Sequence, residues 1–245
     1  MLRQHTKVEQ GIVMAAMRVA LVPVMVPVMV LGLTAGGCGE APSAVPAADA
    51  VAATHLPSGY ALQLDRANRD RTDFVVKADA GELVVETGPA GILYRPDDLE
   101  HIVQAGEANL YRVRGTFTEV GAPMGHREGF GLFIGGQHLG GDEQRYVYFL
   151  VRGDGRYLVK KRDGDATVEL SSGWQSSEAV RVPTDDGGQV TNELAVEVDG
   201  GQLRLFCNGE PVAELLIGET VVSGQVGIRV NHNLHVRVGD LSIDR

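Results

Sequence analysis

A hairpin-like stretch holds the side chains of this sequence that are best suited to binding a ligand. Gly153, Asp154 and Gly155 have the composition of a three-residue loop between two strands. With that loop, cross-strand pairing sets Phe149 against Val159 and predicts one apolar face. The opposite face collects aromatic and basic side chains, in the pairs Tyr146 with Arg162, Tyr148 with Lys160 and Arg152 with Arg156.

Tyrosine rings among positive charges suit a sugar acid, because the ring stacks on the sugar while arginine donates to its carboxylate. Arg152 opposite Arg156 also favours an anion between them, since like charges directly opposite are mildly unfavourable. We therefore expect a glycan on this face, with an acidic glycan as the candidate class. The alternative is a solvated strand pair whose own residues make cation–π contacts.

Trp174 is the only tryptophan and stands in the polar segment 171–177. An indole in such a segment either caps the core or stacks on a ligand. Both interpretations stay open, and Trp174 joins the ligand-binding candidates.

A glycosidase needs paired carboxylates, and strand alternation can point residues i, i+2 and i+4 into one cleft. Glu193, Glu197 and Asp199 share a face, but Ala195 takes the middle position. A solvated outer face is the better interpretation, and we assign no catalytic residue.

Asp163 and Asp165 flank Gly164 and offer oxygen ligands to Ca²⁺. Turn chemistry explains the same residues, and the ligand number falls short of an EF-hand loop. His232 and His235 face opposite sides of a strand at i, i+3. We therefore expect no cofactor and no zinc site, with Ca²⁺ at the two aspartates as a weak candidate.

The elements that must position these residues are strands. Many short segments alternate and are rich in β-branched or aromatic residues. They are residues 83–86, 110–117, 146–151, 157–160, 194–198, 203–207, 226–230 and 234–238. Turn pairs such as Asn208-Gly209 separate them, and only residues 96–102 suit a helix. We therefore predict that residues 58–245 form one domain, an all-β antiparallel two-sheet β-sandwich or jelly roll. Within it, Leu205 and Cys207 are expected on the core side, with Cys207 inert.

The N-terminal residues have the pattern of a secretory signal peptide. Residues 19–33 are uncharged and too few to span a membrane, which needs about 20. Initiation at Met17 rather than Met1 would give a compact charged n-region. The segment 35–38, Ala-Gly-Gly-Cys, resembles the lipobox of bacterial lipoproteins. This resemblance implies a signal peptide over 1–37, acylation of Cys38, secretion through the inner membrane and a membrane lipid anchor.

Residues 38–57 are rich in Ala and Pro and predict a tether. Gly39 is not aspartate, so the resemblance implies the outer membrane if the host has one. Loss of residues 1–37 leaves 19 basic and 31 acidic side chains, a formal charge of −12. This charge argues against a nucleic-acid partner.

Several segments occur in an order typical of one superfamily. They are Gly129-Phe-Gly-Leu-Phe-Ile-Gly135, residues 146–157, Trp174 with Ser177, and residues 192–198, 203–213 and 224–230. Together they resemble a concanavalin A-like lectin/glucanase (laminin-G-like) domain, similar to the 3-keto-disaccharide hydrolase family, formerly a domain of unknown function. The resemblance covers roughly residues 73–243, and its motifs are structural.

We thus expect a lipid-anchored envelope protein with a carbohydrate-binding β-sandwich. The resemblance implies an alternative, a glycoside hydrolase or lyase of the 3-keto-disaccharide type. A protein-binding scaffold is a further alternative.

Overall fold

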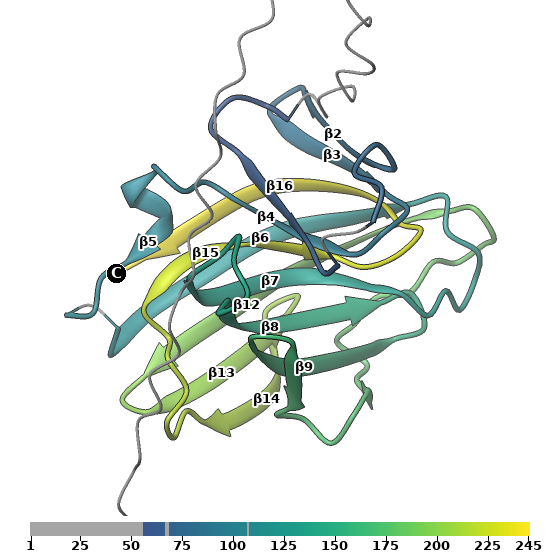
Figure 1. The fold of residues 1–245 in the computed structure, drawn as a ribbon. Coiled ribbons are helices and arrows are strands. Elements are labelled where there is room, and N and C mark those ends of the chain that lie inside the picture. The colour runs from purple at the N-terminus through teal and green to yellow at the C-terminus, as the bar shows by residue number, and fades with distance from the viewer. Residues whose placement is uncertain (1–55, 67–68, 107) are drawn as a thin grey trace, which may run out of the picture. The chain divides into compact units, whose positions relative to one another are not determined.

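The computed structural model describes residues 56–66, 69–106 and 108–245. They form two stacked antiparallel sheets, called sheet A and sheet B below (Figure 1). The predicted all-β two-sheet sandwich is therefore confirmed. The predicted signal peptide, Cys38 and the tether up to residue 55 lie outside the described residues.

Sheet A has a main path of seven strands, with β5 (Ile102–Val103) added beside β15 and β11 (Gln175–Ser176) beside β9. The path runs β1 (Ala61–Leu64), β4 (Gly91–Tyr94), β15 (Gly224–Val230), β7 (Gly129–Gln137), β8 (Arg145–Arg152), β9 (Arg156–Asp163), β10 (Ala166–Glu169).

Sheet B has seven strands. Their order is β14 (Glu210–Leu216), β13 (Gln202–Cys207), β12 (Gln189–Asp199), β6 (Leu110–Val120), β16 (His235–Asp244), β3 (Glu82–Thr87), β2 (Phe74–Asp79).

The expected helix over 96–102 shrinks to one 3-10 turn, η1 (Leu99–His101). The Asp98 side chain accepts from the Glu100 amide and caps this turn, and Ile102 is already extended and joins β5. Among the described residues no helix is long and apolar enough to cross a membrane.

The core lies between the sheets and follows strand alternation. On β13, Leu203, Leu205 and Cys207 are buried and Arg204 and Phe206 are not, as the pattern predicts. Burial raises the pKa of the Cys207 thiol to about 12. Cys207 is therefore a small buried apolar residue with an unreactive thiol.

Strand β8 departs from the expected half-buried pattern, because both of its faces are covered. Val147, Phe149 and Val151 join the core between the sheets. Tyr146, Tyr148 and Leu150 join a second cluster on the other face of sheet A, with Ile92 and Phe133. This second cluster positions the candidate site.

Candidate ligand site on the outer face of sheet A

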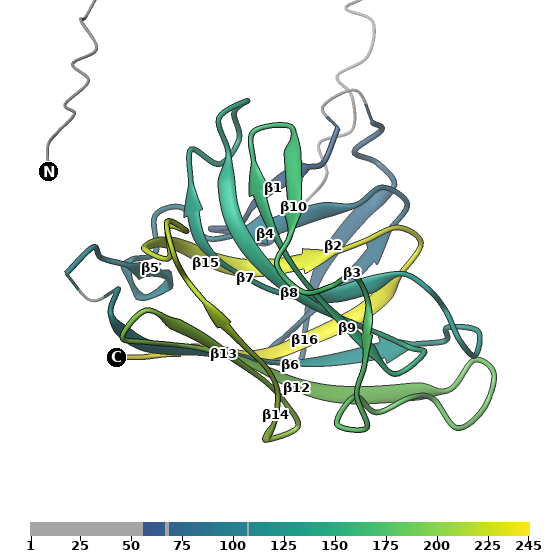
Figure 2. The same cartoon turned by 90° about the horizontal axis from the view of Figure 1, so that it is seen from below.

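Sheet A curves until its two edges approach each other. Four strands lie between β1 and β9. Asp65 directly follows β1, and even so its Oδ1 atom lies only 3.9 Å from Nη1 of Arg162 on β9. Figure 2 shows the edge strands β1 and β10 close together, and residues next to both line one pocket. The outer face of sheet A, which points away from sheet B, is therefore concave.

Arg229 on β15 lies at the centre of this face. Its guanidinium donates to both carboxylate oxygens of Asp65, at 2.7 and 2.6 Å, and to the Tyr146 hydroxyl at 3.1 Å. Arg229 Cζ also lies 4.7 Å from the centroid of the Tyr148 ring. Only 6% of Arg229 is exposed, and its Nε is buried without a hydrogen-bond partner. A buried cation bonded in this way fixes the Asp65 carboxylate.

Asp65 stays ionised at neutral pH. Burial would raise the pKa of its carboxyl, but the hydrogen bond and positive charge of Arg229, with the charge of Arg162, outweigh burial and lower this pKa below 3.8. About a quarter of the side chain, 26%, remains exposed. Asp65 can therefore accept further hydrogen bonds from a ligand.

The structure contains the predicted hairpin register. Tyr146 pairs with Arg162, Tyr148 with Lys160 and Arg152 with Arg156. However, the two tyrosine rings do not form an exposed platform. Tyr146 is 2% exposed and packs on Phe133 at 5.3 Å between ring centroids, and Tyr148 is 5% exposed beneath Arg229. Neither ring therefore presents an exposed face on which a sugar could stack.

The four cations of the hairpin also differ from the expectation, because each has an acidic partner. Asp154 in the loop lies between Arg152 (Nε to Oδ1, 2.6 Å) and Arg156 (Nε to Oδ2, 3.8 Å). The chain thus supplies its own anion across this pair. Lys160 Nζ is 3.1 Å from Glu169 Oε1, and Arg162 lies near Asp65 and Asp165. These four cations are therefore not unpaired, as an anion site for an acidic glycan would require.

Trp174 lies over the same face near the far end of β8. It packs against the second cluster, and Arg152 Cζ is 4.4 Å from the indole centroid. Gly129 lies directly beneath, because an added Cβ there would come within 2.6 Å of the indole. Of the two interpretations of Trp174, capping fits these contacts.

A pocket of ≈ 360 Å³ opens beside Asp65. Its walls are the end of β1, the loop before β8 and the turn after β9. Side chains that line it include Gln63, Asp65, Arg71, Asp142, Gln144 and Asp165. Gln144 is 5% exposed, so its amide belongs to the wall and not to the open surface. A fixed carboxylate and amide groups in one concavity suit a ligand rich in hydroxyl groups.

Sequence reasoning missed most of the residues that form this pocket, and it named Asp165 only as a Ca²⁺ candidate. Asp65 follows a four-residue strand, and Gln63 and Gln144 carry no motif. One signal was available: Arg229 interrupts an apolar strand, Gly224-Gln-Val-Gly-Ile-Arg-Val. A charged residue within such a strand calls for a partner of opposite charge.

The weak Ca²⁺ candidates do not converge. Asp163 Oδ1 accepts from Arg145 Nε at 2.8 Å, and the Asp165 side chain is fully exposed. Among the residues that the structure describes, no group of three or more His, Cys, Asp or Glu side chains could hold a metal ion.

Glu197 and Asp199 lie on the outer face of sheet B and both bind Arg204, at 2.9 and 2.6 Å. Their carboxylates are therefore engaged in ion pairs on the solvent-facing side of the sheet.

Glu119 on β6 is a buried carboxyl outside this site. Its side chain is 1% exposed, Oε1 lies 3.3 Å from His126 Nδ1, and Oε2 is buried without a partner. Burial raises the pKa of Glu119, and this effect exceeds the opposing effect of His126. Glu119 is therefore a buried acid and not an exposed one.

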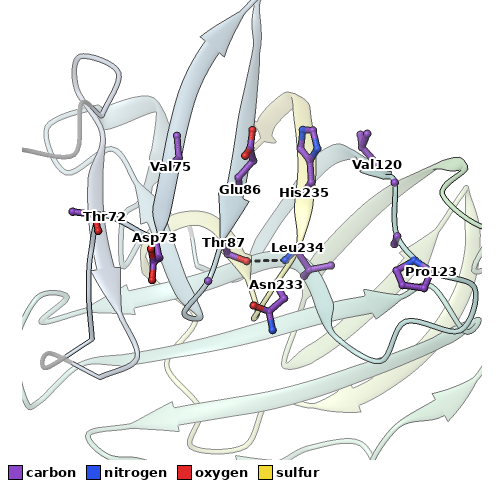
Figure 3. A pocket seen from close by; sticks show the side chains of 13 residues that line it. Thr72, Asp73, Val75, Glu86, Thr87, Val120, Pro123, Asn233, Leu234 and His235 are labelled. Atoms are coloured by element: carbon purple, nitrogen blue, oxygen red, sulfur yellow. Dashed lines mark hydrogen bonds between the residues drawn. The ribbon is translucent and has the colours of Figure 1, made fainter.

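A larger hollow, ≈ 540 Å³, lies where β2, β3 and β16 meet the loop after β6 (Figure 3). Thr87 and Leu234 form its floor, and the Leu234 amide donates to Thr87 Oγ1 at 3.0 Å. The Thr87 hydroxyl in turn donates to the Asn231 carbonyl. These groups already serve the fold, so we assign the hollow no ligand.

A scan against protein-family models gave no match, and neither did a search of curated proteins. Solved structures do match in fold. A carbohydrate binding module, CBM66 from Bacillus subtilis, has a TM-score of 0.52 at 9% identity, covering 76% of this chain and 96% of the module. The metal-free carbohydrate recognition domain of Emp46p has a TM-score of 0.50 at 14% identity, covering 76% and 88%. The chain therefore has the jelly-roll sandwich fold of carbohydrate-binding and lectin-like domains.

Proposed function

We propose that this chain is a glycan-binding protein held at the cell envelope by a lipid on Cys38. Its domain has the fold of structures whose names include a carbohydrate binding module and a carbohydrate recognition domain. The fold alone does not specify a ligand. The pocket beside Asp65 gives the proposal its chemistry.

The observation that carries the proposal is the fixed Asp65 carboxylate at the edge of the pocket. Arg229 holds it by two hydrogen bonds, and the amide side chains of Gln63 and Gln144 line the same pocket. Neighbouring sugar hydroxyls can donate to the carboxylate, while amides both donate and accept. Because Arg229 holds the Asp65 carboxylate before a ligand arrives, binding need not order this group.

A neutral glycan fits this pocket better than an acidic one. Three carboxylates line it, those of Asp65, Asp142 and Asp165, with the guanidinium groups of Arg66 and Arg71. The two further guanidinium groups beside Asp65, those of Arg229 and Arg162, are already paired with its carboxylate. A uronate would add a further negative charge to a chain that already carries an excess of acidic residues. We therefore propose a neutral oligosaccharide as the ligand class.

Binding without catalysis is the form of the proposal that Asp65 supports. A general acid must be protonated near neutral pH, but Arg229 keeps the pKa of Asp65 low. The same carboxylate is engaged by two hydrogen bonds and is poorly placed to act as a nucleophile.

Calorimetric titration tests the proposal. The wild-type chain is titrated with neutral gluco-, manno- and xylo-oligosaccharides and with oligogalacturonates. A Gln63→Ala/Asp142→Ala variant should lose binding of the neutral ligand, and Asp97→Ala, exposed and outside the pocket, should keep it. Binding of oligogalacturonate alone, lost in Tyr148→Ala/Arg152→Ala, would instead support the hairpin and contradict the proposal. New reducing ends after incubation would contradict binding without catalysis.

A further inference from the structure

The described part of the chain enters the sandwich at one end, called the entry end here. Pro57 and Tyr60, before β1, line the same hollow as His101 of η1 and Leu241 of β16. Leu56 packs against the core beside them. The segment that carries Cys38 is therefore joined to the domain at the entry end.

Exposed leucines concentrate at this end. Among the described residues, the large apolar side chains with the greatest exposure are Leu216 at 81%, Leu99 at 73% and Leu110 at 64%. Exposing one such side chain is ordinary, but three at one end of a domain form a pattern.

Strand pairing places two of these leucines in one row. Leu110 at the start of β6 pairs with Asp199, Asp199 pairs with Gln202, and Gln202 pairs with Leu216 at the end of β14. All four positions therefore lie across the same border of sheet B, and Leu110 and Leu216 both point away from the core.

The third leucine borders the same region. The Arg245 guanidinium donates to the carbonyl of Leu99, at 3.3 Å, from the residue after β16. Strand β16 ends beside the start of β6, where Asp244 pairs with Arg112. Val221 lies nearby, because the Tyr111 hydroxyl donates to the carbonyl of Val222 at 2.6 Å.

We propose that the entry end is a membrane-docking surface, with Leu99, Leu110 and Leu216 entering the interface of a lipid bilayer. This inference rests on the proposed lipid anchor at Cys38. The 18 residues from Cys38 to residue 55 span at most about 60 Å even when fully extended, so a chain anchored at Cys38 keeps this end within that distance of the lipid. Such tethering converts a weak contact into an intramolecular one, with an effective concentration in the millimolar range.

Leucine side chains lie in the headgroup and acyl boundary of a bilayer, roughly 5–10 Å deep. The excess of acidic residues means that electrostatic attraction to anionic lipid does not drive the contact. A zwitterionic phosphatidylcholine surface is therefore the partner that this end fits.

Quenching by brominated lipid tests the proposal. Leu216→Trp is made in a Trp174→Phe background, so the new indole is the only one, and Val168→Trp on β10 is the matched control, since Val168 is 50% exposed on sheet A. The acylated full-length chains are reconstituted in phosphatidylcholine vesicles with or without brominated phosphatidylcholine. We expect bromolipid to reduce the emission of the indole at 216 and not that of the indole at 168.

Each other outcome overturns the proposal. A chain that floats with the vesicles but shows equal emission at both positions is anchored but not docked. A chain that does not float lacks the lipid anchor, and docking fails with it. If Cys38→Ala protein without vesicles forms a dimer that Leu216→Ser separates, the partner of this end is a second copy.

Discussion

Asp65 and Arg229 stand 164 residues apart in the sequence and meet in a two-pronged ion pair on the concave face of sheet A, with N–O distances of 2.7 and 2.6 Å. The pair joins strand β15 to the end of β1 across the intervening β4. It also fixes the carboxylate at the edge of the proposed glycan pocket. One contact therefore serves both the fold and the site.

Replacing Asp65 should destabilise the domain more than replacing an exposed acid. Asp65→Ala leaves the Arg229 guanidinium buried without a counter-charge, and we expect a loss of about 3 kcal/mol in the free energy of unfolding. Asp163→Ala is the control, because its pair with Arg145 is half exposed, and we expect it to cost about 0–1 kcal/mol. Urea denaturation measures both, and equal losses would show that the Asp65–Arg229 pair contributes no more than a surface pair.

Glu119 should make the domain less stable as pH rises above 4.5. Its pKa in the folded chain is raised by burial from an ordinary 4.5, so the folded chain binds this proton more tightly than the unfolded chain. Stability is then lost as pH increases from 4.5 through the folded pKa. Glu119→Gln does not titrate at this position, and its stability relative to wild type should increase over that window. Urea unfolding between pH 4 and pH 8 measures the difference, and a decrease with pH would contradict the assignment.

Truncation of Leu205 should strongly reduce the free energy of unfolding of the domain. It is 1% exposed between the sheets, and Leu205→Ala is expected to cost about 2–5 kcal/mol through lost burial and a residual cavity. Leu216→Ala, at an exposed position, is expected to change stability by no more than about 0.5 kcal/mol. Thermal and urea unfolding of the two variants compare them directly. Similar losses in the two variants would mean that the buried and exposed faces of β13 and β14 are wrongly assigned.

Cys38→Ala should release the protein from membranes. Without an acyl chain the proposed anchor is gone, and the leucines of the entry end bind too weakly to hold the chain alone. Fractionation followed by a carbonate wash measures the bound share. Retention of the variant in the washed membranes would contradict the lipoprotein hypothesis.

Much of the fold follows from local pattern. Alternation predicted the strands that hold Leu205 and Cys207, and the Gly153–Gly155 loop fixed the register of β8 against β9. Both signals depend on residues close in sequence. When two strands are joined by a short loop, the loop length and the apolar pattern leave few alternative registers.

The site was harder to predict because its contacts are long-range. Nothing near β8 in the sequence indicates that Arg229 and Trp174 cover its outer face. The acidic partners of Arg152 and Lys160 are local, but only the folded hairpin shows that they neutralise these cations. Curvature of sheet A, which brings Asp65 to Arg162, cannot be derived from alternation alone.

The most direct test of the proposed glycan site is an NMR titration of the side-chain amides of Gln63 and Gln144. Isotope-labelled full-length Cys38→Ala chain is titrated with the same neutral gluco-, manno- and xylo-oligosaccharides. We predict saturable shifts of both amides with a neutral oligosaccharide, because both line the pocket beside Asp65. Unchanged amides at 63 and 144, with saturable shifts in the hairpin of Tyr148 and Arg152 or with none anywhere, would contradict the site.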